Sequence, residues 1–173
     1  MNPAVIVDVD GTLADVSGIR HYVLDDPHKK LFAKFHGASA LVPPIAEVAA
    51  VTRALHAAGL TIIVLTSRRE QWRHVTRRWL AKWEIPFHAL GMRADHDNRR
   101  DDDVKRDLLI RMRRLYDVDP VLAIDDNPIV IALWRSLDIP TVRVPGWDEH
   151  MPTARPMGPN YRRYRKENPD GSR

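Results

Sequence analysis

Two aspartates one residue apart, Asp8 and Asp10, end a short apolar stretch that begins at Val5, and Gly11-Thr12 follows directly. Side chains two residues apart in a strand point the same way, and where a strand breaks into a glycine turn both carboxylates can border one small space. A carboxylate can attack phosphorus to form an acyl-phosphate, while a second, protonated carboxyl gives its proton to the leaving oxygen. An isolated pair of this kind often consists of plain turn residues, but the preceding strand and the Gly-Thr turn favour a catalytic pair.

Polar residues follow two later apolar stretches in the same way. They are Thr66-Ser67-Arg68 after 60–65 and Asp125-Asp126 after 121–124. If the strands are parallel, their carboxyl ends meet at one edge of the sheet, so these groups and the first aspartate pair would converge. Several carboxylates this close cannot all stay ionised unless a cation lies among them. Oxygen ligands without any cysteine favour magnesium, Mg²⁺.

Strand and helix patterns alternate along the chain and predict the elements that must position these side chains. Strands are expected from Val5 to the first aspartate pair and at 60–66, 87–90, 121–124 and 141–144, and helices at 44–58, 70–83, 104–116 and 129–137. This order is typical of an α/β fold, here a Rossmann-like parallel sheet with helices on both faces. The irregular stretch at about 14–44 is expected to be a small flap over the strand ends.

Composition limits the classes of protein to consider. A chain of 173 residues can bury one sizeable core, so we expect a single domain at 1–150 and a basic, flexible tail at 151–173. The lack of cysteine excludes disulfides, thiolate zinc sites and a cysteine nucleophile. No stretch resembles a membrane span or secretion signal, which favours a soluble, cytoplasmic protein. The net charge of +4 comes from many arginines, which suit a phosphate-bearing partner but also accompany an arginine-rich genome.

Four short motifs resemble those of the haloacid dehalogenase (HAD) superfamily of phosphotransferases. They are Asp8-Val9-Asp10-Gly11-Thr12, Thr66 after its strand, Lys105 at the head of a later helix, and Ile124-Asp125-Asp126. A more specific resemblance is to the 3′-phosphatase half of bacteriophage-type polynucleotide kinase-phosphatase. It rests on Met92-Arg93-x-x-x-Asp97-x-Arg99-x-Asp101-x-x-Val104-Lys105 and on Leu133-Trp134-Arg135.

The resemblance implies a role for each motif residue. Asp8 would attack the phosphate, and Asp10 would protonate the leaving hydroxyl and then activate the water that hydrolyses the aspartyl-phosphate. Thr66 would hold a phosphate oxygen, and Lys105 would neutralise charge on the nucleophile and the phosphate. Mg²⁺ would be held by the Asp8 carboxylate, the Asp10 backbone carbonyl and one of Asp125 or Asp126.

The resemblance also implies residues that bind the substrate. Arg68 would contact the phosphate, with Ser67 standing where the family has glycine. In the flap, Arg20 stands one residue later than the arginine of the family. These three side chains are therefore expected around the phosphate.

A segment rich in arginine and aspartate precedes Lys105. On composition alone it is typical of a solvated loop. The resemblance implies a paired network, made by Arg93, Asp97, Arg99 and Asp101, that orients Lys105 and lets the two arginines grip the nucleic-acid backbone.

Three functions fit the sequence. We favour a Mg²⁺-dependent phosphatase that removes 3′-phosphate from DNA or RNA ends, because a small flap would leave the site open to a polymer. The alternatives are a small-molecule phosphatase such as a nucleotidase, and a non-catalytic module that binds nucleic-acid ends. The chain has no G-x-x-x-x-G-K-[ST] loop, so a kinase or ligase acting with it would be a separate partner.

Overall fold

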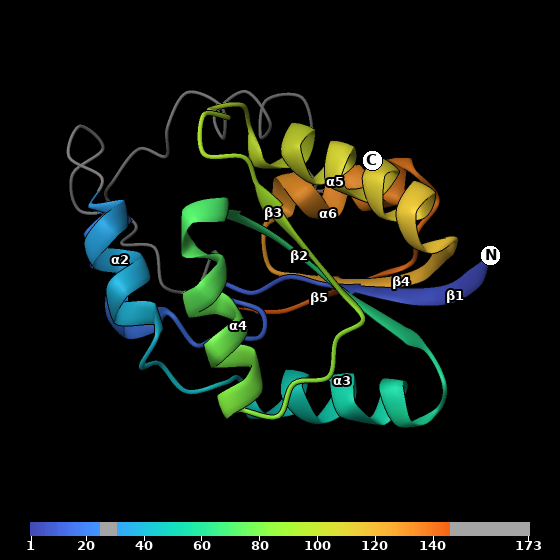
Figure 1. The fold of residues 1–173 in the computed structure, drawn as a ribbon, viewed down its shortest axis with the longest axis horizontal. Helices are drawn as coiled ribbons and strands as arrows, with labels where there is room; N and C mark the ends of the chain where they lie inside the picture. The colour runs from blue at the N-terminus through green and yellow to red at the C-terminus, as the bar shows by residue number, and fades with distance from the viewer. Residues whose placement is uncertain (25–30, 146–173) are drawn as a thin grey trace.

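The computed structural model describes residues 1–24 and 31–145, and Figure 1 shows their arrangement. A five-stranded sheet in the order β3-β2-β1-β4-β5 forms the centre. The strands are β1 (Asn2–Val7), β2 (Thr61–Arg69), β3 (Ala89–Arg93), β4 (Val118–Asp125) and β5 (Thr141–Arg143). Neighbouring strands are parallel throughout, which confirms the predicted α/β fold. The predicted tail at 151–173 lies outside the described residues.

Helices cover both faces of this sheet (Figure 1). They are η1 (Ser17–Ile19), α1 (His21–Leu24), α2 (Phe32–Ser39), α3 (Ala46–Ala57), η2 (Glu70–Trp72), α4 (Arg73–Lys82), α5 (Asp101–Tyr116) and α6 (Pro128–Ser136). α3 and α4 contribute to the core on one face, and α5 and α6 to the core on the other. Among the described helices we find none long and apolar enough to cross a membrane.

The central strand β1 is buried on both faces. Val5 and Val7 pack into the core with α3 and α4, whereas Ala4 and Ile6 pack into the core with α5 and α6. All four side chains are inaccessible to solvent. Successive side chains of a strand point to opposite faces, so a strand covered by helices on both sides needs an unbroken apolar run. The sequence supplies that run, and it carries Asp8 to the middle of the sheet edge.

Two boundaries in the arginine- and aspartate-rich segment differ from those predicted. The strand expected at 87–90 lies at Ala89–Arg93, and the helix expected from Val104 begins at Asp101. Arg93 ends β3, where it pairs with Arg69 of β2, and its side chain is buried and makes internal hydrogen bonds. Three aspartates form the first turn of α5, where negative charge interacts favourably with the helix dipole.

The segment inserted after β1 contains short helices where the sequence predicted irregular backbone. Its ends meet in a β-bridge between Ala14 and Pro44. Phe35 of α2 is buried in the core with α3 and α4, and the indole N–H of Trp79 in α4 donates to the Val42 carbonyl (2.9 Å). Helices this short depend on tertiary contacts rather than on local pattern, so no periodic pattern in the sequence predicted them.

Candidate active site

Strand order reverses at the junction of β1 and β4. The chain passes from β1 to β2 on one side and from β4 to β5 on the other. Asp8 directly follows β1, Asp125 ends β4, and the Asp8 amide donates to the Ile124 carbonyl across the junction (3.1 Å). Ligands of open α/β sheets bind beyond the strand ends at such a reversal.

Three buried carboxylates lie together at this junction. Asp8, Asp125 and Asp126 are 5%, 0% and 1% exposed, and one oxygen of each lies within 4.8 Å of the others. The Asp10 side chain is not a member of this group. Close negative charges in a buried site repel one another, and hard oxygen donors are the ligands of a divalent cation such as Mg²⁺. The donor set therefore fits a divalent cation.

Lys105 links two of these carboxylates. Its ammonium donates to Asp8 Oδ1 (2.7 Å) and to Asp125 Oδ2 (2.8 Å), and the side chain is 3% exposed. Burial alone would lower the pKa of Lys105, but Asp125 and Asp8 outweigh burial and raise it above its usual range. Burial also raises the pKa of Asp8; Lys105 opposes that change, and the neighbouring aspartates add to it. Lys105 thus stays positively charged beside the predicted nucleophile.

Asp125 and Asp126 have different surroundings. Asp125 accepts from the Asn127 amide (3.1 Å) and from the Trp134 indole (3.2 Å), besides Lys105. Asp126 accepts from the Thr12 hydroxyl (3.2 Å) and, at its other oxygen, from a guanidinium of the inserted segment. Burial, assisted by Asp125, raises the pKa of Asp126 to about 7.

Arg20 brings the inserted segment to the carboxylates. Its Nη2 atom lies 3.2 Å from Asp126 Oδ2, and its side chain is 13% exposed. The structure therefore places Arg20 at the site, although one residue separates it from the family pattern. Its contact here is with a carboxylate.

Asp10 forms an ion pair of its own. Arg68 Nε and Nη2 donate to the two Asp10 oxygens (2.8 and 2.6 Å), and Arg68 Nη1 donates to Thr76 Oγ1 (3.2 Å). Arg68 is only 1% exposed. Burial would raise the pKa of Asp10, but the guanidinium outweighs it and holds the pKa below its usual range. Arg68, predicted to contact phosphate, therefore keeps Asp10 ionised in this structure.

Two residues with hydroxyl groups, Thr66 and Ser67, directly precede Arg68 in β2. Thr66 Oγ1 accepts from the Arg68 amide (3.2 Å). Ser67 Oγ is buried and has no hydrogen-bond partner among residues 1–24 and 31–145. A buried hydroxyl without a partner is unfavourable until a ligand or a water bonds it.

The predicted arginine and aspartate network forms, but its bonds are internal. Arg93 donates to the Ser67 carbonyl (3.0 Å), the Arg99 carbonyl (2.7 Å) and Asp101 Oδ1 (2.5 Å), and also to the Asp97 carbonyl. Arg93 thus joins β2, the loop and α5 through its hydrogen bonds. Its predicted contact with the substrate stays a prediction.

Arg99 is half exposed and lies outside the carboxylate cluster. It pairs with Asp97 (2.7 Å) and Asp107 (2.8 Å). Hydrogen bonds from the Arg99 side chain and amide hold the pKa of Asp97 far below its usual range. These exposed pairs order the loop. Asp101 is partly exposed and lies closer to the site, where it accepts from Asn127 Nδ2 (3.2 Å).

Four residues complete the site although the sequence suggested no role for them. They are Thr12, Thr76, Asn127 and Trp134. Three of them had a signal in the sequence. Thr12 and Trp134 stand within the motifs of the family resemblance. Asn127 precedes Pro128, a pattern typical of a helix start, and its side chain caps α6 by accepting from the Ile129 amide (3.1 Å). Thr76 and Trp134 reach the site only through the packing of α4 and α6.

Gly11 is required by this geometry, and we predict that Gly11→Ala destabilises the protein. Gly11 has a φ of +88°, and a Cβ there would overlap the Asp126 carboxylate and the Arg20 guanidinium. The positive φ alone should lower the free energy of unfolding by about 1–2 kcal/mol, measured by urea denaturation. Gly18→Ala is the control, since a Cβ at Gly18 meets nothing within 4 Å. Equal stability of the two variants would contradict the close approach at Gly11.

Comparisons with known proteins agree with this geometry. The model of a family described as the polynucleotide kinase PNKP phosphatase domain matches residues 2–148. A protein of Autographa californica nuclear polyhedrosis virus, provisionally named a bifunctional polynucleotide kinase/RNA ligase, is 30% identical over 141 residues, which are 80% of this chain and 19% of the relative.

Two solved structures resemble this chain in fold. A chain in the structure of a Pnkp1/Rnl/Hen1 complex is 28% identical with a TM-score of 0.70, over 83% of this chain and 46% of that one. The class C acid phosphatase from Bacillus anthracis is 15% identical with a TM-score of 0.60, over 83% of this chain and 66% of that one, and shares the fold. The chain thus spans about a fifth of the viral relative and less than half of the chain in the complex.

Proposed function

The chain belongs to the family of polynucleotide kinase PNKP phosphatase domains, within the HAD phosphatases, and from this premise we propose that it is a Mg²⁺-dependent polynucleotide 3′-phosphatase. Its substrate would be a 3′-phosphorylated DNA or RNA end. One observation carries the proposal: the buried Asp8 carboxylate is held by Lys105 (2.7 Å) beside Asp125 and Asp126 at the strand reversal. That arrangement supports an anionic nucleophile whose charge is balanced in place.

In the first step, an Asp8 oxygen attacks phosphorus, and the bond from phosphorus to the 3′ oxygen breaks. Asp10 protonates the departing oxygen, which leaves as the 3′-hydroxyl. Lys105 stabilises negative charge shared by the aspartyl-phosphate and the phosphoryl oxygens. The Asp8 carboxylate, the Asp10 carbonyl and one of Asp125 or Asp126 would hold Mg²⁺, which when bound supplies further positive charge against the phosphate.

In the second step, Asp10 takes a proton from the water that hydrolyses the aspartyl-phosphate. The ion pair with Arg68 suits this step, because it keeps Asp10 ionised. The first step needs a protonated Asp10. A phosphate that draws Arg68 to itself would leave burial as the main influence on Asp10 and so raise its pKa. Thr66 and the unpartnered Ser67 hydroxyl would donate to the phosphate oxygens.

The viral relative is named for polynucleotide kinase and RNA ligase activities, and the similar solved chain comes from a Pnkp1/Rnl/Hen1 complex. These names support a role in which the chain prepares 3′ ends for joining, with a kinase or ligase as its partner. The short insertion, tied to the body at Ala14 and Pro44, supports a polymer end as the substrate, because a small cap does not enclose a small molecule.

We predict that the protein prefers a 3′-phosphorylated oligonucleotide to the corresponding 3′-mononucleotide. The kcat/KM for phosphate release should be at least about tenfold higher for the oligonucleotide, because a polymer offers further phosphates to the protein surface. Release should require Mg²⁺ and stop with a chelator. A preference for mononucleotides would instead favour a small-molecule phosphatase.

A further inference from the structure

α4 carries five basic residues and no acidic one in ten positions. They are Arg73, His74, Arg77, Arg78 and Lys82. By contrast, α5 has three aspartates in its first turn and arginines in its last, as the helix dipole favours. α4 follows that preference only at Lys82 in its last turn and opposes it at Arg73 and His74 in its first turn. Basic residues four apart also repel one another, so helix stability does not explain this composition.

Three of the five basic side chains have local partners. Arg73 pairs with Glu70 (2.6 Å), the Arg77 guanidinium lies 5.9 Å from the centroid of the Phe87 ring, and the Lys82 ammonium contacts the Trp83 ring. His74, Arg78 and Lys82 recur every fourth residue and therefore share one side of the helix. We call these three the α4 stripe.

The α4 stripe is exposed and borders a depression. His74, Arg78 and Lys82 are all exposed, and with Ala40, Val75 and Trp79 they line a hollow of about 200 Å³ between α4 and the end of α2. Within the part of the chain that the structure describes, His74 and Arg78 make no ion pair or hydrogen bond, and the Lys82 ammonium lies 5.0 Å from the Trp83 ring centroid. The stripe is thus available to a ligand.

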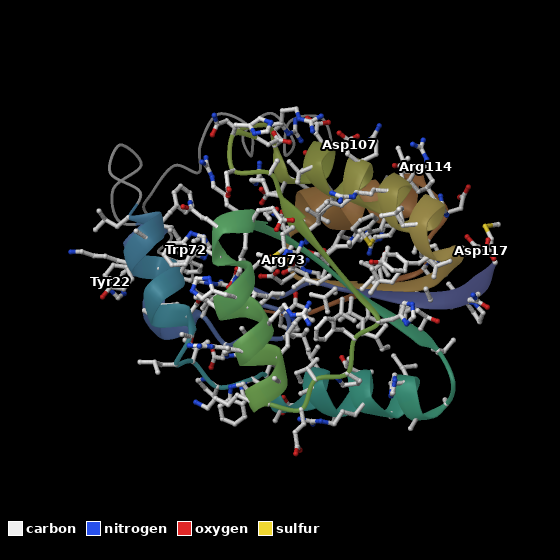
Figure 2. The ribbon with its side chains drawn as sticks, viewed as in Figure 1. Tyr22, Trp72, Arg73, Asp107, Arg114 and Asp117 are labelled. Atoms are coloured by element: carbon white, nitrogen blue, oxygen red, sulfur yellow. The ribbon has the colours of Figure 1, made fainter. Side chains whose placement is uncertain are left out.

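The first turn of α4, which carries His74, packs next to the catalytic groups. Thr76 of α4 accepts from Arg68, which holds Asp10. Trp72, just before α4, contacts His36 of α2 with ring centroids 5.4 Å apart, and Figure 2 shows Trp72 between these helices. The stripe therefore starts on the turn of α4 that is nearest the site and leads away from it along the hollow between α4 and the end of α2.

We propose that the α4 stripe binds the phosphate backbone of the single strand upstream of the 3′ end. The occupant is a polyanion because the groove offers cations without acidic neighbours on α4. A helix rises about 1.5 Å per residue, so the stripe is about 12 Å long and spans about three to four phosphates of a stacked strand. This inference rests on the proposed function and adds a surface that would distinguish polymers from mononucleotides.

The test compares two double variants of equal charge. Arg78→Ala/Lys82→Ala removes two cations from the stripe, whereas Arg111→Ala/Arg114→Ala removes two exposed cations from α5, on the other face of the sheet. Figure 2 shows Arg114 on the outer side of α5. Both pairs are introduced into Asp8→Asn protein, and binding of a 3′-phosphorylated 12-nucleotide single strand, as DNA and as RNA, is followed by fluorescence anisotropy over a range of salt concentrations.

Loss of the stripe should weaken binding about tenfold and reduce the slope of log affinity against log salt by about 1.4, since each single-strand phosphate contact contributes about 0.7. The α5 variant should match its parent. In the active protein, the stripe variant should raise KM for the 12-nucleotide strand with kcat unchanged, and Arg78→Lys/Lys82→Arg should restore it.

The outcomes separate this inference from the proposed function. The inference would be overturned if both double variants lost the same affinity for the strand, or if the stripe variant kept the salt slope of its parent. Neither result would affect the proposed function as long as the wild type still releases phosphate from oligonucleotides. Wild-type protein that releases no phosphate from 3′-phosphorylated strands would overturn the proposed function itself.

Discussion

Replacing Asp8 with asparagine is expected to reduce phosphate release by at least about 10⁴-fold, because an amide cannot attack phosphorus and nucleophile removal in covalent enzymes has effects of this size. The change leaves the shape of the side chain almost unaltered. Lys105 keeps its second partner, Asp125 (2.8 Å), so the buried ammonium is not stranded. The measurement is single-turnover release of phosphate from a 3′-phosphorylated oligonucleotide with Mg²⁺.

Folding and catalysis can be separated in this variant. Burial raises the pKa of Asp8, so its ionised form at neutral pH costs stability that the neutral asparagine does not. Asp8→Asn should therefore unfold at a urea concentration no lower than the wild type. Asp119→Asn, a change at a half-exposed carboxylate paired with Arg113, is the matched control and should retain full activity. Substantial turnover by Asp8→Asn would exclude Asp8 as the nucleophile. When the wild type is quenched with acid during turnover of a substrate that carries a labelled 3′-phosphate, the label should be bound covalently to the protein.

Replacing Lys105 with methionine should damage both stability and activity. The methionine fills a similar volume but leaves Asp8 and Asp125 buried without their shared cation, which donates at 2.7 and 2.8 Å. Removing one partner of a buried ion pair typically lowers the free energy of unfolding by about 3–5 kcal/mol. Loss of a charge that stabilises the transferring phosphoryl group should lower kcat by a further factor of about 10²–10³.

Urea denaturation and steady-state kinetics measure the two effects of Lys105→Met. Lys34→Met is the control, since Lys34 is an exposed lysine of α2, and this variant should behave as the wild type. Mg²⁺ should stabilise Lys105→Met more than the wild type, because a cation bound to the folded state alone replaces part of the missing charge. A Lys105→Met protein as stable as Lys34→Met would mean that the buried carboxylates do not depend on the lysine.

The strand and helix order is the part of this protein that local sequence controls most directly. β1 is covered on both faces, so Ala4 to Val7 must all be apolar, and the carboxylate that follows must lie at the sheet edge. The apolar runs of β2 and β4 have the same cause. Because parallel strands align their carboxyl ends, the sequence alone placed Asp8, Asp125 and Asp126 together. The same reasoning predicted a divalent cation, which the cluster of three carboxylates fits.

Boundaries and partners within polar segments depended on contacts far apart in sequence. Arg93 and Asp101 belong to β3 and α5 because they bond to each other and to neighbouring elements. The short helices of the inserted segment likewise exist because Phe35 and its neighbours pack on the core. Local pattern carries no information about such contacts.

Which residues carry charge at the sheet edge follows from local sequence, because strand burial and the alignment of parallel strands leave little choice. How those charges pair follows from the packing of elements far apart in the chain. Sequence alone does not distinguish a buried arginine that pairs with Asp10, such as Arg68, from an arginine exposed on a helix, such as Arg78. Its partner is the carboxylate that packing brings within hydrogen-bond distance. Burial and these ion pairs together shift the pKa of Asp8, Asp10 and Asp126.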